Sequence, residues 1–504
     1  LTIGRYPVTN SNELAIMLSN RENYVRNPQG GWWRNSAVLL ADDLYNSSAT
    51  IETIHSVQTE AAGNNIHPSI LTDKIFAWEY EYDEFQNKPG ARDDMMAAIN
   101  EGRLIWLYTG HGAYDKLGAE DYFNGAADMG RFNNQDRLPF FVASSCSVCH
   151  FDYWGFESLG QKTVMMDNLG AIASFAASRS SSPTSNGPMM NHLLDKLTNG
   201  RNSLGQSIMI AKVLNTQSND NDATYMLMGD PLLNVVPPVR DSLMTVSGQA
   251  AQGDTLHARD LAIVSGSFAS SPVSGTFEIK AFNTKREYDL GWHTLVTQRG
   301  APLFSGSATV TGGAYQTEFI VPDDVTPGNN GFIVSYVWDP AQKQDYTSYH
   351  HPLALSDDAV TAENPDAPEI KLYIGSYDFR PGDTVGTNTT LYARISDSNG
   401  INVTGSFGHN IMLILDNSLQ PVPVTDYFIY DLDSYTTGLL TFPLTGLSEG
   451  PHTLQLIAFD NFNLPAVASV EFNVKESGEL AIERFLIYPN PMQSSTSFTF
   501  TLSR

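Results

Sequence analysis

The sequence predicts a mixed α/β domain with a mostly parallel sheet over residues 1–236, followed by tandem all-β, immunoglobulin-like sandwiches. In the first part, short apolar runs alternate with segments of helical period, which is typical of parallel strands joined by crossover helices. At residues 235–238 the string Val-Val-Pro-Pro ends this pattern. Beyond it, short alternating runs lie between Gly, Pro, Asn and Asp turns, a pattern that indicates β-sandwiches.

Each apolar run of the first part predicts a buried strand, and each segment of helical period predicts a helix. The expected strands are residues 37–40, 104–108, 139–143 and 171–175. The expected helices are residues 50–62, 92–100, 156–168 and 204–214. Every strand then has room for a crossover helix, and a mostly parallel sheet follows.

Proline-bearing joints divide the second part of the chain. We expect one β-sandwich over residues 239–364 and, after the joint Asn-Pro-Asp-Ala-Pro, a second over residues 368–476. Residues 480–504 begin a further strand pattern, the start of a C-terminal β domain. Because the chain starts without Met and ends inside an alternating pattern, we expect a piece of a longer polypeptide, with the first domain truncated at its N-terminus.

Composition excludes several classes of function. The 55 acidic and 29 basic residues give a formal net charge of −26, which makes nucleic acid an unsuitable partner. The 41% of apolar residues suffices for buried cores, while 17% charged residues is below the roughly 25% of average proteins and fits an exported, strand-rich protein. No stretch approaches the roughly 20 apolar residues of a membrane helix, so we expect any membrane contact to be peripheral.

A histidine and a cysteine follow two of the expected strands where each strand ends. Residues 104–108 run directly into Thr-Gly-His-Gly, which puts His111 between two glycines at the carboxyl end of its strand. Residues 138–143 end in Ser-Ser-Cys, which puts Cys146 at the corresponding place on another strand. Since α/β sheets form their sites at the carboxyl ends of neighbouring strands, we expect these two side chains to meet.

A cysteine and a histidine that meet in this way form a nucleophile and its base. The imidazole takes or stabilises the thiol proton, and the thiolate attacks a carbonyl. The backbone amides of Gly112 and Cys146 are then expected to hold the oxyanion, a contribution on the order of 10²–10³ in rate per donor. The alternatives are that His111 is an ordinary turn histidine and that Cys146 is a buried, inert thiol.

The only two cysteines, Cys146 and Cys149, lie in the string Cys-Ser-Val-Cys-His, which fits both a redox pair and a covalent haem site. A strand leads straight into the first cysteine, whereas haem attachment usually belongs to small helical domains. The small βαβ context of a thioredoxin-like pair is also absent from the sequence. Zinc needs more thiols or more closely spaced histidines than this sequence shows, so we expect no metal in the site.

A third catalytic group is expected to orient His111. The strand at residues 37–40 ends in Ala-Asp-Asp, so the carboxylate of Asp43, or of Asp42, is placed to accept the imidazole N–H. An aspartate that caps the following loop is the alternative. Glu52, near the start of the next helix, is a second candidate acid, although an acidic first turn also suits the helix dipole.

The first part of the chain resembles the gingipain family of caspase-like cysteine peptidases. Five segments carry the resemblance in matching order and spacing: residues 4–8, 108–112, 138–146, 170–174 and 228–232. The resemblance implies a caspase-like fold for residues 1–236 and cysteine endopeptidase activity. The sequence departs from the family by about a dozen extra residues around positions 80–89 and by Cys149.

By position, the resemblance implies that His111 is the general base and Cys146 the nucleophile. It places Asp43 closest to the acid that orients the histidine. It places Glu52 near the acid with which some gingipains bind a basic side chain before the scissile bond, which makes Glu52 a candidate for a substrate pocket. The extra residues around positions 80–89 blur both acidic assignments.

The β part resembles the sortase branch of this family, which serves type IX secretion. Residues 432–438, 450–454 and 487–491 carry this second resemblance. It implies a peripheral enzyme on the outer membrane at the cell surface that removes the C-terminal signal domain of secreted cargo. It also implies transfer of the new carboxyl end to anionic lipopolysaccharide, and docking to the outer-membrane β-barrel PorV.

No required cofactor is implied by the resemblance. Surface loops of such folds often bind calcium as a structural ion, and the sequence does not decide whether these do. A different class of function also stays open, in which the caspase-like part is an inactive scaffold of a secretion or attachment complex and the β domains are its working surface. Labelling of the active-site thiol separates the two.

Overall fold

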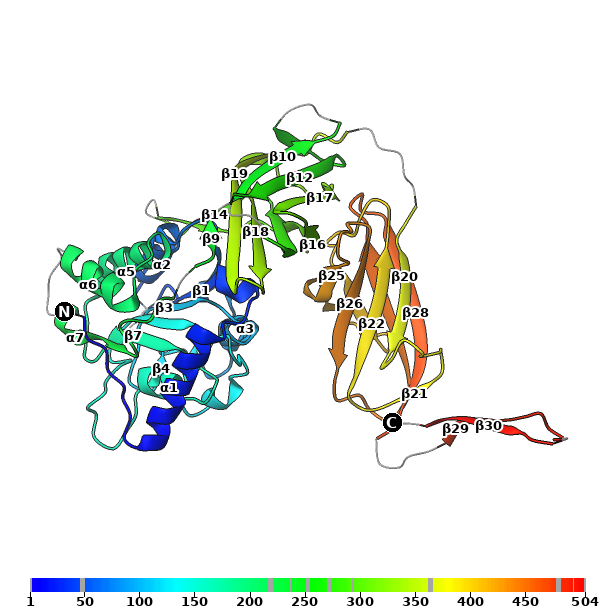
Figure 1. Cartoon of the computed structure of the whole chain (residues 1–504), viewed down its shortest axis with the longest axis horizontal. Helices are drawn as coiled ribbons and strands as arrows, with labels where there is room; N and C mark the ends of the chain where they lie inside the picture. The colour runs from blue at the N-terminus through cyan, green and yellow to red at the C-terminus, as the bar shows by residue number, and fades with distance from the viewer. Residues whose placement is uncertain are drawn as a thin grey trace.

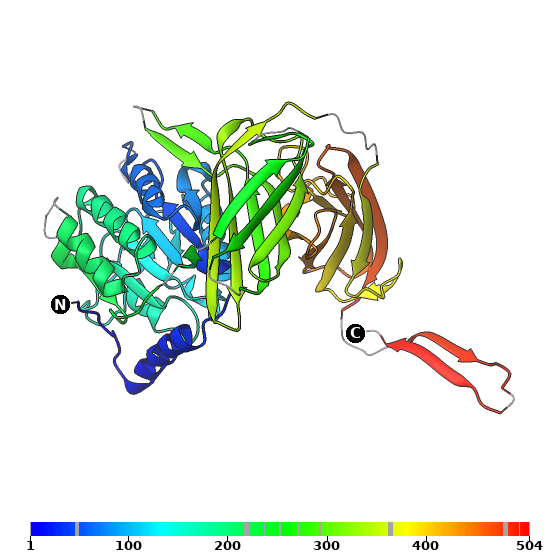
Figure 2. The ribbon, with the colours of Figure 1, turned by 45° about the horizontal axis from the view of Figure 1, so that its top comes forward.

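A computed structural model describes residues 2–45, 50–215, 221–235, 237–240, 242–250, 254–269, 273–291, 294–360, 366–476, 482–492 and 494–502. The chain forms an α/β domain, two β-sandwiches and a separate C-terminal hairpin (Figure 1). In a second view the first sandwich lies between the α/β domain and the second sandwich (Figure 2). Within the described ranges, no helix is both long enough and apolar enough to cross a membrane.

The α/β domain is built on a six-stranded sheet in the order β2-β1-β3-β6-β7-β8. The first five strands of this order are parallel, and β8 pairs antiparallel to β7. The strands are β1 (Ser36–Ala41), β2 (Leu71–Phe76), β3 (Ile105–Thr109), β6 (Phe140–Ser144), β7 (Ala173–Ala177) and β8 (Tyr225–Met228). A two-stranded ribbon, β4 (Lys116–Leu117) with β5 (Phe123–Asn124), follows β3.

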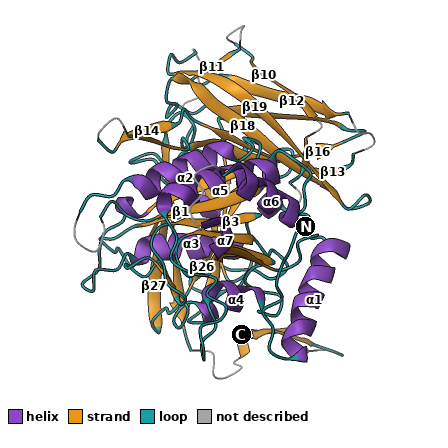
Figure 3. Cartoon of the chain, turned by 90° about the vertical axis from the view of Figure 1, so that its left-hand side faces the viewer, coloured by secondary structure: helices purple, strands orange, loops and turns teal. Residues whose placement is uncertain are grey.

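Helices cover both faces of the sheet, with α5 and α6 on one side and α1 and α4 on the other (Figure 3). The helices are α1 (Ser11–Arg26), α2 (Ile54–Asn65), α3 (Pro89–Glu101), α4 (Leu159–Val164), α5 (Pro183–Thr198), α6 (Leu204–Leu214) and α7 (Asn221–Thr224). Short 3₁₀ turns are η1 (Trp32–Asn35), η2 (Ala77–Glu79) and η3 (Met129–Arg131).

Successive side chains of each strand pack on opposite faces of the six-stranded sheet. In β3, Leu107 packs with residues of α2, α5 and α6, whereas Trp106 and Tyr108 pack with residues of α3 and α4. All five residues of β3 and of β6 are buried. Because successive side chains of a strand point to opposite faces, a continuous apolar run is what a sheet covered on both sides requires.

Two mostly antiparallel sheets form the first sandwich. One has the order β10-β12-β17, and the other has the order β11-β19-β18-β13-β16 with β9 paired to β19. Its strands are β9 (Val239–Arg240), β10 (Ser242–Gly248), β11 (Thr255–His257), β12 (Leu261–Phe268), β13 (Gly275–Phe282), β16 (Pro302–Val310), β17 (Ala314–Ile320), β18 (Gly328–Asp339) and β19 (Gln344–Ser356). A hairpin of β14 (Arg286–Asp289) and β15 (Leu295–Gln298) projects from it.

The second sandwich pairs the sheet β20-β22-β26-β25 with the sheet β21-β28-β27-β23-β24. Its elements are β20 (Glu369–Ile374), β21 (Thr384–Val385), β22 (Thr389–Ser396), β23 (Met412–Leu415), β24 (Val422–Pro423), η4 (Thr425–Tyr427), β25 (Phe428–Tyr430), β26 (Thr437–Leu444), β27 (Gly450–Phe459) and β28 (Pro465–Val474). The C-terminal hairpin consists of β29 (Ile482–Tyr488) and β30 (Ser497–Leu502).

The predicted fold class, an α/β domain with a mostly parallel sheet followed by β-sandwiches, is confirmed. The domain limits expected at residues 236, 364 and 480 fall outside the described residues. The four expected strands and four expected helices correspond to β1, β3, β6, β7, α2, α3, α4 and α6, with shifts at their ends. The sequence interpretation missed β2 and β8 of the sheet, the ribbon β4–β5, and the helices α1, α5 and α7.

Buried polar contacts join the α/β domain to the first sandwich. The guanidinium of Arg34 pairs with the carboxylate of Asp345, and their side chains are 10% and 2% exposed. Next to this pair, the Asn35 amide donates to Thr347 Oγ1 at 3.1 Å and the Tyr336 hydroxyl accepts from the backbone of Gly31 at 2.7 Å. The two domains are therefore packed against each other through desolvated groups.

We expect Asp345→Ala to lower the free energy of unfolding by about 3–5 kcal/mol, because it leaves the Arg34 guanidinium buried without a counter-charge. Glu369→Ala is the matched control, since the pair of Glu369 with Lys371 is solvent-exposed and is expected to contribute little to stability. Urea unfolding of both variants measures the difference. Equal stability of the two variants would contradict a structural role for the buried pair.

Candidate active site

The loop after β3 fixes the backbone of His111. The N–H of His111 donates to Asp42 Oδ2 at 2.8 Å, and the Tyr108 hydroxyl donates to the His111 carbonyl at 2.6 Å. Gly110 is required beside them, because a Cβ there would lie 2.3 Å from the Tyr108 hydroxyl oxygen and 2.6 Å from Asp42 Oδ2. The side chain of His111 is 54% exposed, so its ring is accessible from solvent.

Glu52 holds the imidazole of His111. Nε2 of His111 lies 3.0 Å from Oε2 of Glu52, whose own side chain is 23% exposed. Glu52 precedes α2, and its backbone N–H donates to the Leu44 carbonyl at 2.7 Å, which ties it to the end of β1. When Nε2–H donates to the carboxylate, the lone pair of the neutral ring lies on Nδ1.

Cys146 follows β6, the strand next to β3, with Thr109 in register with Ser144. The N–H of Ser181 donates to Cys146 Sγ at 3.3 Å, which fixes the position of the sulfur beside residue 181. The two loops also touch, because a Cβ on Gly112 would lie 3.4 Å from the Cys146 carbonyl oxygen. His111 and Cys146 thus project from adjoining loops at one edge of the sheet.

The amides expected to hold an oxyanion, those of Gly112 and Cys146, have no acceptor among the described residues. The bridge between Gly112 and Leu117 uses the flanking groups instead, with Ala113 N–H donating to the Lys116 carbonyl at 2.9 Å. Amides without an internal partner beside a nucleophile are what an oxyanion hole needs.

Cys149 has a packing role. Its side chain is fully buried, and its Sγ lies 3.7 Å from Ser174 Oγ. A Cβ on Gly160 would lie only 2.3 Å from that sulfur. Burial raises the pKa of the Cys149 thiol to about 12, so it stays protonated at neutral pH and is a poor nucleophile. Both cysteines are free thiols.

Asp43, predicted to orient His111, has other partners in the structure. Its carboxylate accepts from the Tyr82 hydroxyl and, at 2.9 Å, from the backbone N–H of Tyr45. Among the described residues no hydrogen bond joins Asp43 to His111. The extra segment around residues 80–89 supplies Tyr82, and Lys88 Nζ lies 4.0 Å from the Tyr82 ring centroid. This segment therefore covers Asp43, and Glu52 is the acid beside the imidazole.

Acidic neighbours set the protonation of His111. Burial acts to lower the pKa of His111, but the hydrogen bond to Glu52 and the charges of Asp42, Glu52 and Glu120 outweigh it, so the pKa is raised above its usual value. The ring therefore holds a proton to higher pH than a free histidine does. A protonated ring favours the thiolate of a neighbouring cysteine.

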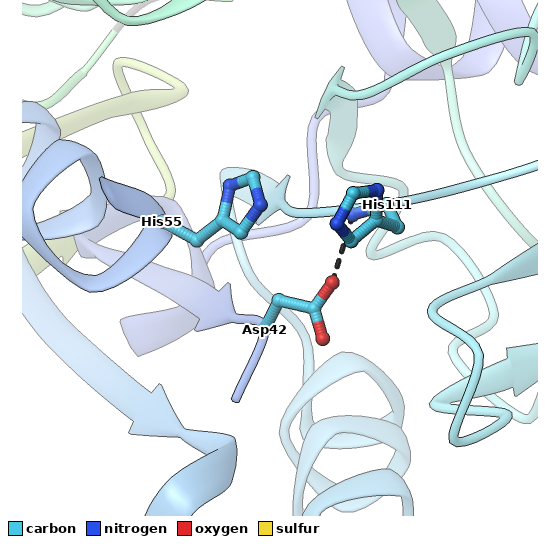
Figure 4. A group of neighbouring side chains, drawn as sticks. All are labelled: Asp42, His55 and His111. Atoms are coloured by element: carbon cyan, nitrogen blue, oxygen red, sulfur yellow. Dashed lines mark hydrogen bonds between the residues drawn. The ribbon is translucent and has the colours of Figure 1, made fainter. Parts of the chain in front are cut away.

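The sequence interpretation missed a second histidine at this edge. His55, in the first turn of α2, makes an edge-to-face contact with the His111 ring, with the ring centroids 5.2 Å apart. Figure 4 shows the two imidazoles above the carboxylate of Asp42. Burial lowers the pKa of His55 below its usual value, and the nearby carboxylates oppose this only in part. The signal in the sequence that could have indicated His55 is its position three residues after Glu52.

An aromatic cluster lies on the chain just beyond Cys146. Tyr153 stacks near Tyr114 and Phe156, with ring centroids 4.8 and 5.4 Å apart. Trp154 is 94% exposed. Arg179 anchors this segment by a two-pronged ion pair with Asp152 at 2.8 and 2.7 Å. The cluster offers an apolar surface that continues from the cysteine loop.

Comparison with known families gives one match, which covers the α/β domain. Residues 1–236 match the model of the family described as peptidase family C25. The match covers 236 of the 504 residues, so residues 1–236 are similar to this family, the gingipain-like cysteine peptidases, as the sequence motifs predicted. The matched region contains both strands that position His111 and Cys146.

Solved structures give weaker likenesses. A structure titled dimeric latent PorU from Porphyromonas gingivalis is 24% identical, covers 67% of this chain and 34% of its own, and gives a TM-score of 0.33. This chain thus spans about a third of the length of that PorU. A structure titled only as a protease is 12% identical, and the match covers 68% of this chain and 73% of that one. Its TM-score is 0.37.

A structure of fibronectin(III)-like modules of Clostridium thermocellum CbhA is 14% identical and covers 47% of this chain and 95% of its own, with a TM-score of 0.15. No curated protein matches the sequence. The likeness of residues 1–236 to family C25 therefore rests on the family match.

We expect Cys146→Ala to abolish labelling of the C25 domain by a thiol-directed peptide probe, whereas Cys149→Ala keeps most of it, because the Cys149 thiol is buried and protonated. Intact mass after labelling gives the stoichiometry. Labelling that survives in Cys146→Ala and disappears in Cys149→Ala would mean that the nucleophile is misassigned.

We expect Glu52→Gln to lower turnover on the order of 10²-fold or more, with a small change in KM, because Glu52 orients the ring of His111. Loss of its negative charge also lowers the pKa of His111. Activity that needs the protonated ring is lost as pH rises through that pKa, so the alkaline limb of the pH–rate profile moves to lower pH.

Asp43→Asn is the matched control for Glu52→Gln, since Asp43 is the acid that the sequence placed near His111 but its carboxylate accepts from Tyr82 and Tyr45. We expect it to leave the alkaline limb in place. If the alkaline limb of the pH–rate profile moves in Asp43→Asn and stays in place in Glu52→Gln, then Asp43 is the acid that orients His111.

Proposed function

We propose that this protein is a cysteine endopeptidase in which Cys146 is the nucleophile, His111 the base and Glu52 the group that orients His111. The observation that carries the proposal is the pairing of β3 with β6 inside a C25 domain, because it sets His111 and Cys146 on adjoining loops. The hydrogen bond of Glu52 to the imidazole supports the third role.

The reaction follows from these positions. Nδ1 of His111 accepts the thiol proton, and the thiolate of Cys146 attacks the scissile carbonyl. The amides of Gly112 and Cys146 donate to the oxyanion of the tetrahedral intermediate. The imidazolium then protonates the leaving amine, which leaves a thioester between the cargo carboxyl end and Cys146. Water or a second amine completes the cycle by attack on that thioester.

Substrate selection involves the surroundings of the pair. The exposed aromatic cluster beyond Cys146 supports binding of apolar side chains next to the cleaved bond. The role of Glu52 as a pocket for a basic side chain stays a prediction, and its bond to His111 favours the orienting role instead. Basic-residue specificity is therefore no part of the proposal.

We further propose that the enzyme is a sortase of type IX secretion, which removes the C-terminal signal domain of cargo and passes the thioester to an amine of anionic lipopolysaccharide. The motif resemblance of the β domains to the sortase branch supports this. The same resemblance supports a place on the outer membrane at the cell surface and docking to PorV. Sandwich loops are natural recognition surfaces for such large partners.

The test is incubation of the purified chain with a cargo protein that bears an intact C-terminal signal domain, with and without a soluble amine acceptor. We expect two products in water and, with the amine, a cargo product heavier by the acceptor minus water. Mass spectrometry of both products gives the cleaved bond. Cys146→Ala is the control and is expected to give neither product.

Cleavage without any amine adduct would support the endopeptidase and contradict the sortase. No cleavage, together with no labelling of Cys146, would favour the inactive scaffold, with the β domains as the working surface of a secretion complex.

A further inference from the structure

Three potential metal ligands converge beside the catalytic pair. Asp42 follows β1, His55 lies in the first turn of α2 and His111 follows β3. One ligand atom from each of these residues lies within 4.8 Å of the other two (Figure 4). The three residues come from separate elements, so the sheet edge itself brings them together.

His55 is the observation that points to a ligand. The residue is 4% exposed, and both of its ring nitrogens are buried without a hydrogen-bond partner among the described residues. The nearest carboxylate oxygen, Oε1 of Glu52, is 3.6 Å from Nε2, too long for a hydrogen bond. Buried polar groups are almost always bonded, so an unpartnered imidazole next to a second imidazole needs an explanation.

The donor set selects the class of ligand. Two imidazole nitrogens and one carboxylate oxygen suit Zn²⁺ and similar transition-metal ions, whereas Ca²⁺ and Mg²⁺ prefer oxygen ligands alone. Zinc ligands at about 2.0–2.2 Å are roughly 3.3 Å apart in a tetrahedron, so a separation of up to 4.8 Å closes by small side-chain rotations. The half-exposed ring of His111 leaves an entry path.

The carboxylate is already oriented for this role. Asp42 is 3% exposed, and its Oδ2 accepts from the backbone N–H of His111 at 2.8 Å and faces the Tyr108 hydroxyl at 3.3 Å. Such outer contacts hold ligating carboxylates in place and raise metal affinity. The second carboxylate oxygen, Oδ1, accepts from the backbone N–H of Asp43 at 3.0 Å.

We propose that Asp42, His55 and His111 form a binding site for a Zn²⁺-type ion, and that this ion inhibits the peptidase reversibly. A ring nitrogen that binds zinc has no lone pair for a proton, so His111 in the bound state is unable to take the proton of Cys146. Release of the ion returns the free base. The inhibition rests on the function proposed above, whereas the binding site does not.

Zinc binding is tested on the full chain carrying Cys146→Ala, so that the catalytic thiol contributes nothing. After removal of metal with a chelator, calorimetric titration with Zn²⁺ is expected to show one site. Adding His55→Phe is expected to weaken it at least 10-fold. The matched control adds His150→Ala, because His150 also lies near Cys146 and has a carboxylate 3.6 Å away. This variant is expected to leave the zinc affinity unchanged.

A second measurement keeps the test valid if the His55 variant fails to fold. X-ray absorption at the zinc edge, on the Cys146→Ala chain with one equivalent of Zn²⁺, is expected to show two imidazoles and oxygen without sulfur. Absence of a stoichiometric site, fewer than two imidazoles, or equal affinity in the folded His55→Phe chain would overturn the proposal.

Inhibition is measured separately on the chain with Cys146 in place. We expect Zn²⁺ to stop cargo cleavage at the concentration that fills the site, and a chelator to restore it. Zinc that binds at the Asp42, His55 and His111 site without slowing a demonstrably active enzyme would overturn the inhibitory part. If the chain has no peptidase activity at all, the proposed function is contradicted instead. The result of the zinc-binding measurement is then judged by itself.

Discussion

The pairing of two parallel strands, β3 and β6, is the constraint on which the site depends. Their register places Thr109 opposite Ser144, and the next residues of both strands leave the sheet at one edge. β1 lies on the other side of β3 and ends in register there, with Ala41 opposite Thr109. Side chains that follow these positions by one or two residues, among them Asp42, His111 and Cys146, therefore lie at the same edge of the sheet, whatever their distance along the chain.

Asp42 turns that shared edge into a charged site. It is buried, and it binds the backbone of His111 rather than the imidazole, so its carboxylate raises the pKa of the ring without blocking it. Glu52 is then free to bind the ring itself. The division of work between a carboxylate that holds the backbone and one that holds the ring keeps the imidazole both oriented and accessible.

Much of the fold, and the positions of His111 and Cys146, followed from the sequence because strand ends and continuous apolar runs are local signals. β2 was missed because Asp73 and Lys74 interrupt its apolar run. In the structure Asp73 is paired with Arg103 and Arg299, and Lys74 with Glu60, so the charges are neutralised by neighbours that no local pattern reveals.

The acids were harder to assign for a related reason. Spacing alone placed Asp43 near the histidine, but the segment that supplies Tyr82 lies over Asp43 and Glu52 reaches the ring from the start of α2. The nearness of His55 to His111 likewise depends on how α2 packs against the sheet. Tertiary contacts of this kind are invisible to a pattern read along one chain.

The first sandwich also bears on the site, because it packs against the strand that carries Asp42. Val296 of the β14–β15 hairpin is fully buried in one cluster with Ala41 and Phe76, the last residues of β1 and β2. Trp78 extends this contact, with its ring 5.7 Å from that of Phe76 and 5.6 Å from that of Tyr288. Since Ala41 directly precedes Asp42, the hairpin packs against the chain just before the carboxylate that accepts from the His111 N–H. The first sandwich is therefore part of the structural support of the candidate active site.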